Sequence, residues 1–287
     1  MRTIDGIGDF LHQLDYIITT KFIPNITGGI QPTENERLLF SLPPSMGGLG
    51  IPIFAEEANN EFKNSIEMTR NLANNITNQE RTYNLDQNEQ RRIKNNIKAC
   101  RRENHRTKAD HVFENMTTTQ QRLHEINSTK GASIWLSTLP LKEEGYQLDK
   151  GVFWDLIKIR YGKPLSRLPD ACSCGARFDL QHALSCKKGG FVTLRHNIIR
   201  NITADLLTEI CKDVRIEPSL QTITGEEMPK GSITSNEARL DVSARDFWIP
   251  YQKAFFDIRV FNPLAGRYGN MSIEKAHEIN EKEKKKA

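Results

Sequence analysis

The chain has 287 residues, 37% of them hydrophobic and 26% charged, and it carries a formal net charge of +4. No run of about 18 apolar residues occurs, and no apolar segment follows the first residues, so the sequence predicts neither a membrane span nor secretion. The mean hydropathy of −0.57 is low for a compact globule. We therefore expect part of the chain to be extended, polar helix, attached to one or two modest domains.

The N-terminal half is predicted to be mainly helical. Residues 1–30 have apolar residues at helical spacing and then a glycine-rich turn. Residues 38–54, LLFSLPPSMGGLGIPIF, are broken by prolines and glycines and predict turns with a short strand. The segment 61–150 is predicted to be a helical linker, in which residues 87–127 form one long exposed helix or a pair of helices.

A basic stretch lies within this predicted linker. Between residues 88 and 108, eight Lys or Arg residues are opposed only by Glu89 and Glu103, an excess of 8 − 2 = 6 positive charges. Such an excess is typical of a phosphate-binding face, although a solvated helix face is the alternative. The candidate nucleic-acid contacts here are Arg91, Arg92, Lys94, Lys98, Arg101 and Arg102.

A cysteine and histidine cluster follows a predicted helix at residues 152–161. Its pattern is Cys-x-Cys-x7-His-x3-Cys, and it is formed by Cys172, Cys174, His182 and Cys186. The first two are close enough to bind one ion from a tight turn, and the last two are four residues apart, one turn of helix. Four such ligands in fifteen residues predict a closed, structural zinc knuckle rather than a catalytic site. Clustering with histidine favours metal over disulfides and indicates a reducing compartment.

Residues 191–213 predict an amphipathic helix. Its apolar residues recur every four positions, and we expect that stripe to face the core: Leu194, Ile198, Ile202, Leu206 and Ile210. A strand-like run at 214–223, a loop at 225–237 and a charged helix from residue 273 complete the pattern, with two strands at 238–245 and 253–261.

The two strands each carry one aspartate. Fifteen residues separate Asp241 from Asp257, so that neighbouring strands can bring both carboxylates to one face. Two adjacent carboxylates repel unless a cation lies between them, and Mg²⁺ bound there would activate water for phosphodiester attack. Glu209 is a candidate third acid. Alternatively, the aspartates cap turns or pair with Arg239 and Arg259.

The order of these features resembles one family. CSCG, His182 and Cys186 are followed by Gly189-Gly190, then by Arg195-His196-Asn197, Glu217-Pro218, Arg239-Leu240-Asp241 and Asp257. This order is similar to the C-terminal part of R2-like non-LTR retrotransposon reverse transcriptase polyproteins, over roughly residues 150–287. More loosely, SLPPSMGGLGIPIF resembles the stretch after the polymerase palm.

The resemblance implies a fold and an organisation. The chain would be α+β, with a helical N-terminal half, a zinc knuckle and an incomplete restriction-endonuclease-like core of the PD-(D/E)xK type. Its segments would be a thumb-like remnant at 1–60, the linker at 61–150, a helix with the knuckle at 151–190 and the nuclease domain at 191–287. The chain is expected to begin after the palm and to stop before the nuclease fold ends, as a fragment or degenerate copy.

The resemblance also implies roles for individual residues. Asp241 and Asp257 would bind Mg²⁺, Glu209 would assist, and Arg259 or Lys275 would stabilise developing charge. The sequence departs from the family at Leu240, where a proline is usual, and at Arg259, where lysine is usual; arginine cannot act as a base. Arg195 and His196 match a family signature and are candidate nucleic-acid contacts, or they buttress the helix.

The implied function is Mg²⁺-dependent nicking of target DNA, which primes reverse transcription in the nucleus. The partners would be the DNA target and the element RNA. No Asp-Asp pair occurs anywhere, so the chain has no polymerase active site. The alternatives are a non-catalytic nucleic-acid-binding protein and an inactive relic.

Overall fold

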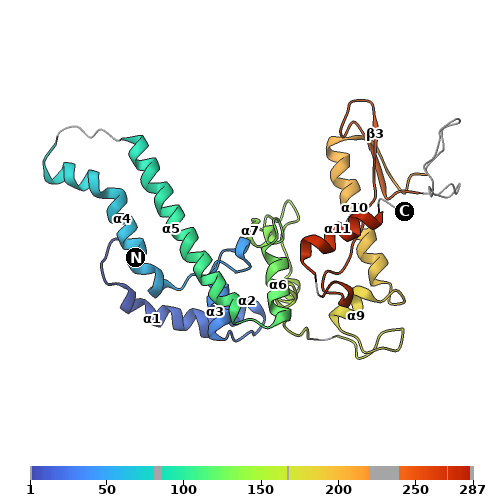
Figure 1. Ribbon diagram of the computed structural model, residues 1–287, viewed down its shortest axis with the longest axis horizontal. Coiled ribbons are helices and arrows are strands. Elements are labelled where there is room, and N and C mark those ends of the chain that lie inside the picture. The colour runs from blue at the N-terminus through green and yellow to red at the C-terminus, as the bar shows by residue number, and fades with distance from the viewer. Residues whose placement is uncertain (1, 81–85, 167, 220–238, 270, 285–287) are drawn as a thin grey trace. The chain divides into compact units, whose positions relative to one another are not determined.

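A computed structural model gives the structure of the chain (Figure 1). It divides into two compact units, residues 1–165 and residues 166–287, and each is considered by itself. The residues described are 2–80, 86–166, 168–219, 239–269 and 271–284.

Every regular element in the described part of the first unit is a helix, which confirms the helical N-terminal half. A π-helix, Ile18–Phe22, continues the first helix, and a 3₁₀ turn, Pro44–Met46, follows the third. The α-helices are α1 Gly8–Ile17, α2 Ile23–Thr27, α3 Glu34–Ser41, α4 Phe54–Thr77, α5 Gln87–Glu114, α6 Thr118–Ser128, α7 Ile134–Ser137 and α8 Lys150–Arg160.

Side-chain caps explain where two of these helices begin. Thr33 and Glu36 form a capping box that starts α3, because each side chain bonds the backbone N–H of the other residue. The Asp15 carboxylate accepts the N–H groups of Phe54 and Ala55, both at 2.9 Å, and so caps α4 from another helix.

The expected short strand within residues 38–54 is wrong. The chain instead turns back on the end of α3, where the N–H groups of Leu49 and Ile51 both donate to the Phe40 carbonyl. Gly48 passes so close to Leu42 that an added Cβ would lie 1.9 Å from the Leu42 carbonyl oxygen. These local bonds satisfy the backbone without a strand partner.

The core of the first unit gathers around the shorter helices, with α5 reaching it only at its C-terminal end. Along α4 only Ala58 is buried, and along α5 only Ile97, Ala109 and Val112 are. Figure 1 shows these two long helices running side by side, and α4 also packs on α1 while α5 packs on α3. The pair of helices predicted over residues 87–127 is therefore present, as α5 and α6. The buried core residues are Ile23, Ile30, Leu39, Phe40, Leu42, Ala109, Val112, Ile157 and Tyr161.

The second unit combines helices with a small antiparallel sheet, which confirms the α+β class. The strand order is β1-β2-β3, and Val242 of β2 lies opposite Phe256 of β3. The strands are shorter than predicted, and residues 220–238 lie outside the described part of the chain. The elements are α9 Leu180–Ser185, α10 Phe191–Ile210, β1 Lys212–Ile216, β2 Val242–Arg245, β3 Lys253–Phe256, a 3₁₀ turn Gly266–Tyr268 and α11 Ile273–Lys284.

The predicted orientation of the helix at 191–213 is wrong. The side of α10 that packs against the sheet carries Ala204 and Leu207, which contact Val242 and Ala244. The small side chain of Ala204 lets α10 and β2 approach closely. The recurrence of large apolar residues at every fourth position does not predict this contact. The stripe itself is exposed, at 55% for Leu194, 48% for Ile198, 50% for Ile202, 59% for Leu206 and 73% for Ile210.

The boundary between the units differs from the predicted segments. Helix α8 contributes Ile157 and Tyr161 to the first core, whereas the cysteine cluster belongs to the second unit. The predicted segment 151–190 therefore contains parts of both units.

Candidate metal centre and acid pair

The cysteine and histidine cluster is built by a tight turn and a short helix. The Cys172 N–H donates to the Ala176 carbonyl at 2.8 Å, and Gly175 has a φ of 88°, which lets the chain reverse between them. Asp179 then caps α9 by accepting the His182 N–H at 2.7 Å. The turn presents the first two sulfurs, and α9 presents His182 and Cys186.

The four ligand atoms have the spacing that a tetrahedral metal requires. All lie within 4.8 Å of one another. Cys172 Sγ and Cys186 Sγ are 3.9 Å apart, and Cys174 Sγ lies 3.3 Å from His182 Nε2. A zinc ion with Zn–S bonds of about 2.3 Å separates two sulfur ligands by about 3.8 Å. The cluster can therefore hold a metal ion such as zinc, as the sequence predicted.

The surroundings shift the pKa values of two of the thiols in opposite directions. Hydrogen bonds from the Cys174 amide and from His182 lower the pKa of Cys172 to about 6, so this sulfur is a thiolate near neutral pH. The Ala176 amide favours the thiolate of Cys174, but burial and the neighbouring sulfurs outweigh it and raise the pKa of Cys174. A cation among the sulfurs would remove that repulsion.

The two aspartates lie opposite each other in the second unit. Val242 pairs with Phe256, so the residue before β2, Asp241, faces the residue after β3, Asp257. The Asp257 side chain is hydrogen-bonded to Asp241. Two carboxyl groups in such contact need a shared proton or a cation between them. The strand pairing predicted from the sequence thus brings these two acids together.

Asp241 has two further partners. His196 of α10 approaches with Nε2 at 2.9 Å from Asp241 Oδ1, and the Ile258 N–H donates to Oδ2 at 2.5 Å. Burial opposes ionisation, but the bonds from the Ile258 amide and from His196 outweigh it, so the pKa of Asp241 lies below its usual value. His196 therefore contacts the acid pair. His196, Ile258 and Asp257 thus occupy three of the four lone-pair positions of the Asp241 carboxylate.

The other three predicted catalytic residues are Glu209, Arg259 and Lys275. Glu209 is exposed, thirteen residues beyond His196, which is about 20 Å along a helix axis, so it does not join the pair. Arg259 forms an ion pair with Glu283 of α11 and lowers the pKa of that carboxyl. Lys275 is exposed in the first turn of α11.

The predicted basic residues divide into two groups. Arg195 donates to the Leu184 carbonyl at 3.4 Å and so joins α10 to α9. The six residues on α5 are exposed, although Arg101 pairs with Glu61. Three of the six line an open groove against the turn at residues 43–46, together with Arg106 of the same basic stretch and with His105, which the count of Lys and Arg left out. Its basic lining is Lys98, Arg101, Arg102, His105 and Arg106.

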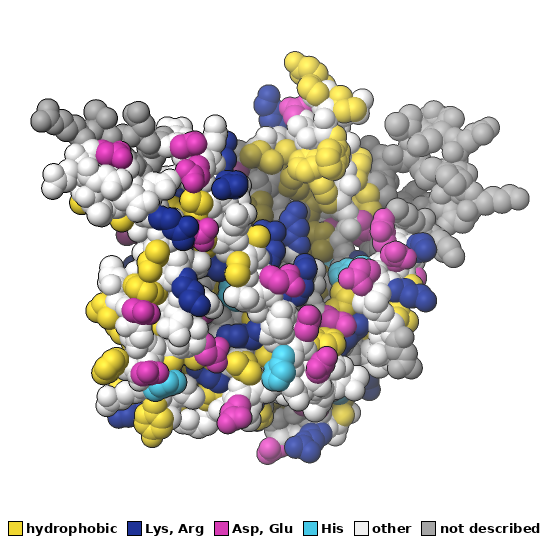
Figure 2. Space-filling view, turned by 60° about the vertical axis from the view of Figure 1, so that its left-hand side comes forward, with side chains coloured by type: hydrophobic (Ala, Val, Ile, Leu, Met, Phe, Trp, Pro, Cys, Tyr) yellow, Lys and Arg dark blue, Asp and Glu magenta, His cyan; other side chains and the backbone are white. Residues whose placement is uncertain are grey.

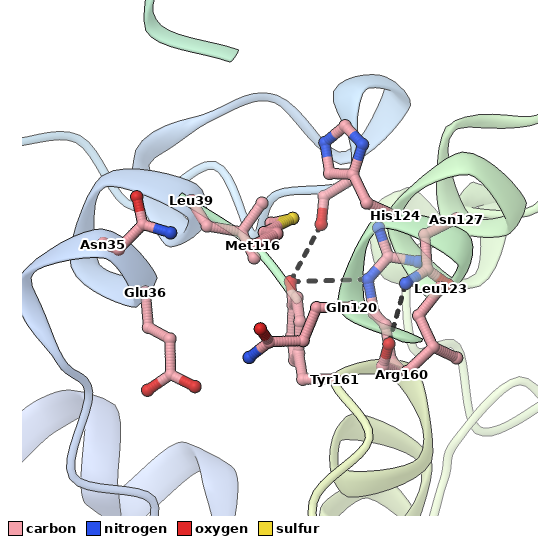
Figure 3. Close-up of a pocket in the computed structure, with 11 residues that line it drawn as sticks. Asn35, Glu36, Leu39, Met116, Gln120, Leu123, His124, Asn127, Arg160 and Tyr161 are labelled. Carbon is pink, nitrogen blue, oxygen red and sulfur yellow. Dashed lines mark hydrogen bonds between the residues drawn. The ribbon is translucent and has the colours of Figure 1, made fainter. Parts of the chain in front are cut away.

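The sequence reading also missed a buried polar cluster in the first unit. Figure 3 shows Arg160 and Tyr161 at a cavity of about 30 Å³, room for one or two water molecules. Arg160 donates to Ser133 Oγ at 2.9 Å and to the Gly48 carbonyl, and Tyr161 donates to the Gly47 carbonyl at 3.1 Å. Burial raises the pKa of Tyr161 to about 12. The cluster holds the turn after α3 in place.

Comparisons with known proteins bring no relative. No family model, no curated protein and no solved structure matches the chain. In the part of the chain that the structure describes, no helix is long and apolar enough to cross a membrane.

Proposed function

We propose that the chain is a metal-dependent DNA endonuclease, derived from an R2-like retrotransposon, that nicks target DNA for target-primed reverse transcription in the nucleus. The observation that carries the proposal is the contact between the Asp241 and Asp257 carboxyl groups at one end of the β2–β3 pair. The order of motifs along the sequence supports the same reading.

The donor set is suited to Mg²⁺, which prefers carboxylate oxygen ligands and keeps several waters. Asp241 and Asp257 would hold the ion, which supplies an activated water for attack on a phosphodiester. His196 and the Ile258 amide fix the orientation of the Asp241 carboxylate. Lys275 remains the candidate for stabilising developing charge, since Arg259 is engaged by Glu283.

Zinc in the Cys172, Cys174, His182 and Cys186 cluster would have a structural role. A closed set of four protein ligands leaves no open position for a reacting water. The cluster lies directly before α10, which contributes both His196 and the helix side that packs on the sheet. Zinc would therefore stabilise the segment that leads into the acid pair.

Nicking of supercoiled plasmid DNA tests the proposal. With Mg²⁺ we expect the wild-type chain to convert plasmid to the open circle, and Asp241→Asn and Asp257→Asn to lose this activity. Glu209→Gln is the matched control, because Glu209 is an exposed carboxylate on α10. Equal nicking by Asp241→Asn and wild type would refute the assignment.

A second candidate is a nucleic-acid-binding protein without catalysis, favoured by the basic groove along α5. Its cations would contact phosphates, and each contact removed should lower the slope of log affinity against log salt by about 0.7–0.9. Lys98→Ala and Arg102→Ala should show this change, and the exposed Lys130→Ala should not. Binding with this salt dependence, but without nicking by the wild type, would favour the second candidate.

A further inference from the structure

The loop between β2 and β3, residues 246–252, is here named the hairpin tip. It carries three large side chains in solvent: Trp248 is 78% exposed, Ile249 is 51% exposed and Tyr251 is 90% exposed. In Figure 2 a hydrophobic projection with Lys or Arg beside it stands at the top of the view, where the β2–β3 hairpin ends in Figure 1. Exposed tryptophan and tyrosine grouped in this way are typical of a binding surface.

The hairpin tip is braced from below by aromatic contacts. Trp248 packs edge-on against Phe247, with ring centroids 4.6 Å apart, and Phe247 packs edge-on against Phe256 at 5.0 Å. Phe256 is partly buried and packs against the core of the second unit. The exposed indole is therefore held by a continuous line of rings that ends in the core.

The backbone of the hairpin tip is held as well. Asp246 accepts the Tyr251 N–H at 2.5 Å and donates its own N–H to the Gln252 carbonyl at 3.0 Å. Asp246 and Tyr251 have φ values of 70° and 68°, in the left-handed region that residues other than glycine seldom adopt. A strained backbone that presents a tyrosine to solvent points to a use for that side chain.

Cations surround the base of the hairpin tip. Lys212, Arg245 and Lys253 lie opposite one another across the three strands. With Arg215 they make four positive charges against the carboxylates of Asp213 and Asp246, an excess of 4 − 2 = 2. Lys212 is 84% exposed and Arg245 is 48% exposed. Aromatic faces beside an excess of positive charge fit single-stranded nucleic acid, which offers flat bases and phosphates together.

We propose that the hairpin tip binds unpaired nucleotides, with bases stacked on Trp248 and Tyr251 and phosphates near Arg245 and Lys253. This inference rests on the proposed function and adds its substrate class, DNA with unpaired bases near the nick. Arg245, at the end of β2, is four positions beyond Asp241, about 13 Å along an extended strand.

Fluorescence anisotropy with a labelled 12-nucleotide single strand and its duplex tests the inference on the full chain, without Mg²⁺. A salt concentration of about 0.3 M weakens purely electrostatic binding. We expect Trp248→Ala and Tyr251→Ala each to weaken single-strand binding by roughly 5- to 100-fold, and Trp248→Phe to keep most of the affinity. Phe10→Ala, which removes another exposed aromatic ring, should have no effect.

The salt dependence separates stacking from charge. Trp248→Ala should leave the salt slope unchanged, whereas Lys253→Ala should reduce it by about 0.7. Unchanged zinc content and melting temperature would show that the variants fold. Wild-type affinity in both alanine variants would overturn the inference. The inference would also be overturned if Trp248→Ala and Tyr251→Ala mainly changed the oligomeric state or the binding to anionic vesicles. The hairpin tip would then contact protein or lipid rather than nucleic acid.

Nicking activity is not part of this measurement. If Trp248→Ala loses single-strand binding while the wild type fails to nick plasmid, the inference stands and the proposed endonuclease fails. If nicking is lost in Asp241→Asn but binding is the same in Trp248→Ala and wild type, the inference fails and the endonuclease stands.

Discussion

Each residue of the cysteine and histidine cluster is placed by its own local structure. The Gly175 turn sets the first two sulfurs, and the Asp179 cap starts the helix that carries His182 and Cys186. Because the geometry depends on short-range contacts alone, ligand spacing in the sequence was enough to predict it.

Loss of one ligand should release the metal. We expect the wild-type chain to carry one zinc ion and Cys174→Ser to lose most of it, together with stability of the second unit, because ligand binding and folding are coupled. Metal content measured on purified protein checks this. Cys211→Ser, which changes a cysteine outside the cluster, is the control. Full zinc content in Cys174→Ser would contradict the ligand assignment.

His124 makes the first unit sensitive to pH. Burial lowers its pKa, opposed by the bond from its ring to the Met46 carbonyl at 3.1 Å, while Arg160 lowers it further. The pKa of His124 in the folded chain is therefore lower than its pKa of about 6.5 in the unfolded chain, and between these two values only the unfolded chain binds the proton. The stabilising contribution of neutral His124 is full above a pH of about 6.5 and is lost as the pH falls toward the folded-state pKa.

The test compares thermal melting at about pH 7.5 and about pH 5.5. The wild type should lose more stability than His124→Gln between these two values, because glutamine does not titrate. His111→Gln, at an exposed histidine, should behave as the wild type does. If His124→Gln and the wild type lost the same stability between these two pH values, the pH dependence would belong to another group.

The acid pair shows which side-chain contacts a sequence can predict. Strand alternation and fifteen-residue spacing predicted that Asp241 meets Asp257. The bonds from His196 to Asp241 and from Arg259 to Glu283 were not predictable, since they depend on how α10 and α11 pack in three dimensions.

At the scale of elements, the turn after α3 depends on a close backbone approach. Gly48→Ala would place a methyl group 1.9 Å from the Leu42 carbonyl oxygen, so we expect a loss of about 3 kcal/mol or more in the free energy of unfolding. A Cβ added at Gly266 has no atom within 4 Å, so Gly266→Ala should change the free energy of unfolding by less than about 0.5 kcal/mol. Denaturant unfolding measures both; equal stability of the two variants would contradict the close approach.

The orientation of α10 is tested by two adjacent leucines. Leu207 is 5% exposed, and Leu207→Ala should cost about 2–4 kcal/mol, as for other core leucines. Leu206 is 59% exposed, and Leu206→Ala should cost less than about 0.5 kcal/mol. Denaturant unfolding measures both variants. A larger loss of stability in Leu206→Ala than in Leu207→Ala would show that the stripe is the buried face after all.

Periodicity predicted that residues 191–213 form a helix but not which side is buried. Nine apolar residues larger than alanine lie along α10, and packing against the sheet decides whether the predicted stripe or the side with Ala204 is buried. Helix existence is a local property, whereas the buried side depends on long-range packing. The mistaken strand within residues 38–54 has the same origin, because Arg160 and Tyr161 hold that turn from far along the chain.

At the scale of the whole molecule, the composition predicted one feature well. The low apolar content corresponds to α4 and α5, which bury few side chains, while each unit keeps a core of its own. The boundary after residue 165 was not predictable, because α8 reads equally well as the start of the second unit or the end of the first.

The proposed activity depends on a divalent cation held by the acid pair in a unit organised by zinc. Titration with Mn²⁺, followed by the electron paramagnetic resonance of the free ion, measures that cation directly. Mutation of a residue that only hydrogen-bonds to a metal ligand typically lowers metal affinity by about 10- to 100-fold. Asp257→Asn changes a proposed ligand itself, so it should weaken Mn²⁺ binding at least about tenfold. Zinc content should stay unchanged, and Glu209→Gln should bind as the wild type does. Equal Mn²⁺ affinity in Asp257→Asn and wild type would contradict the central claim.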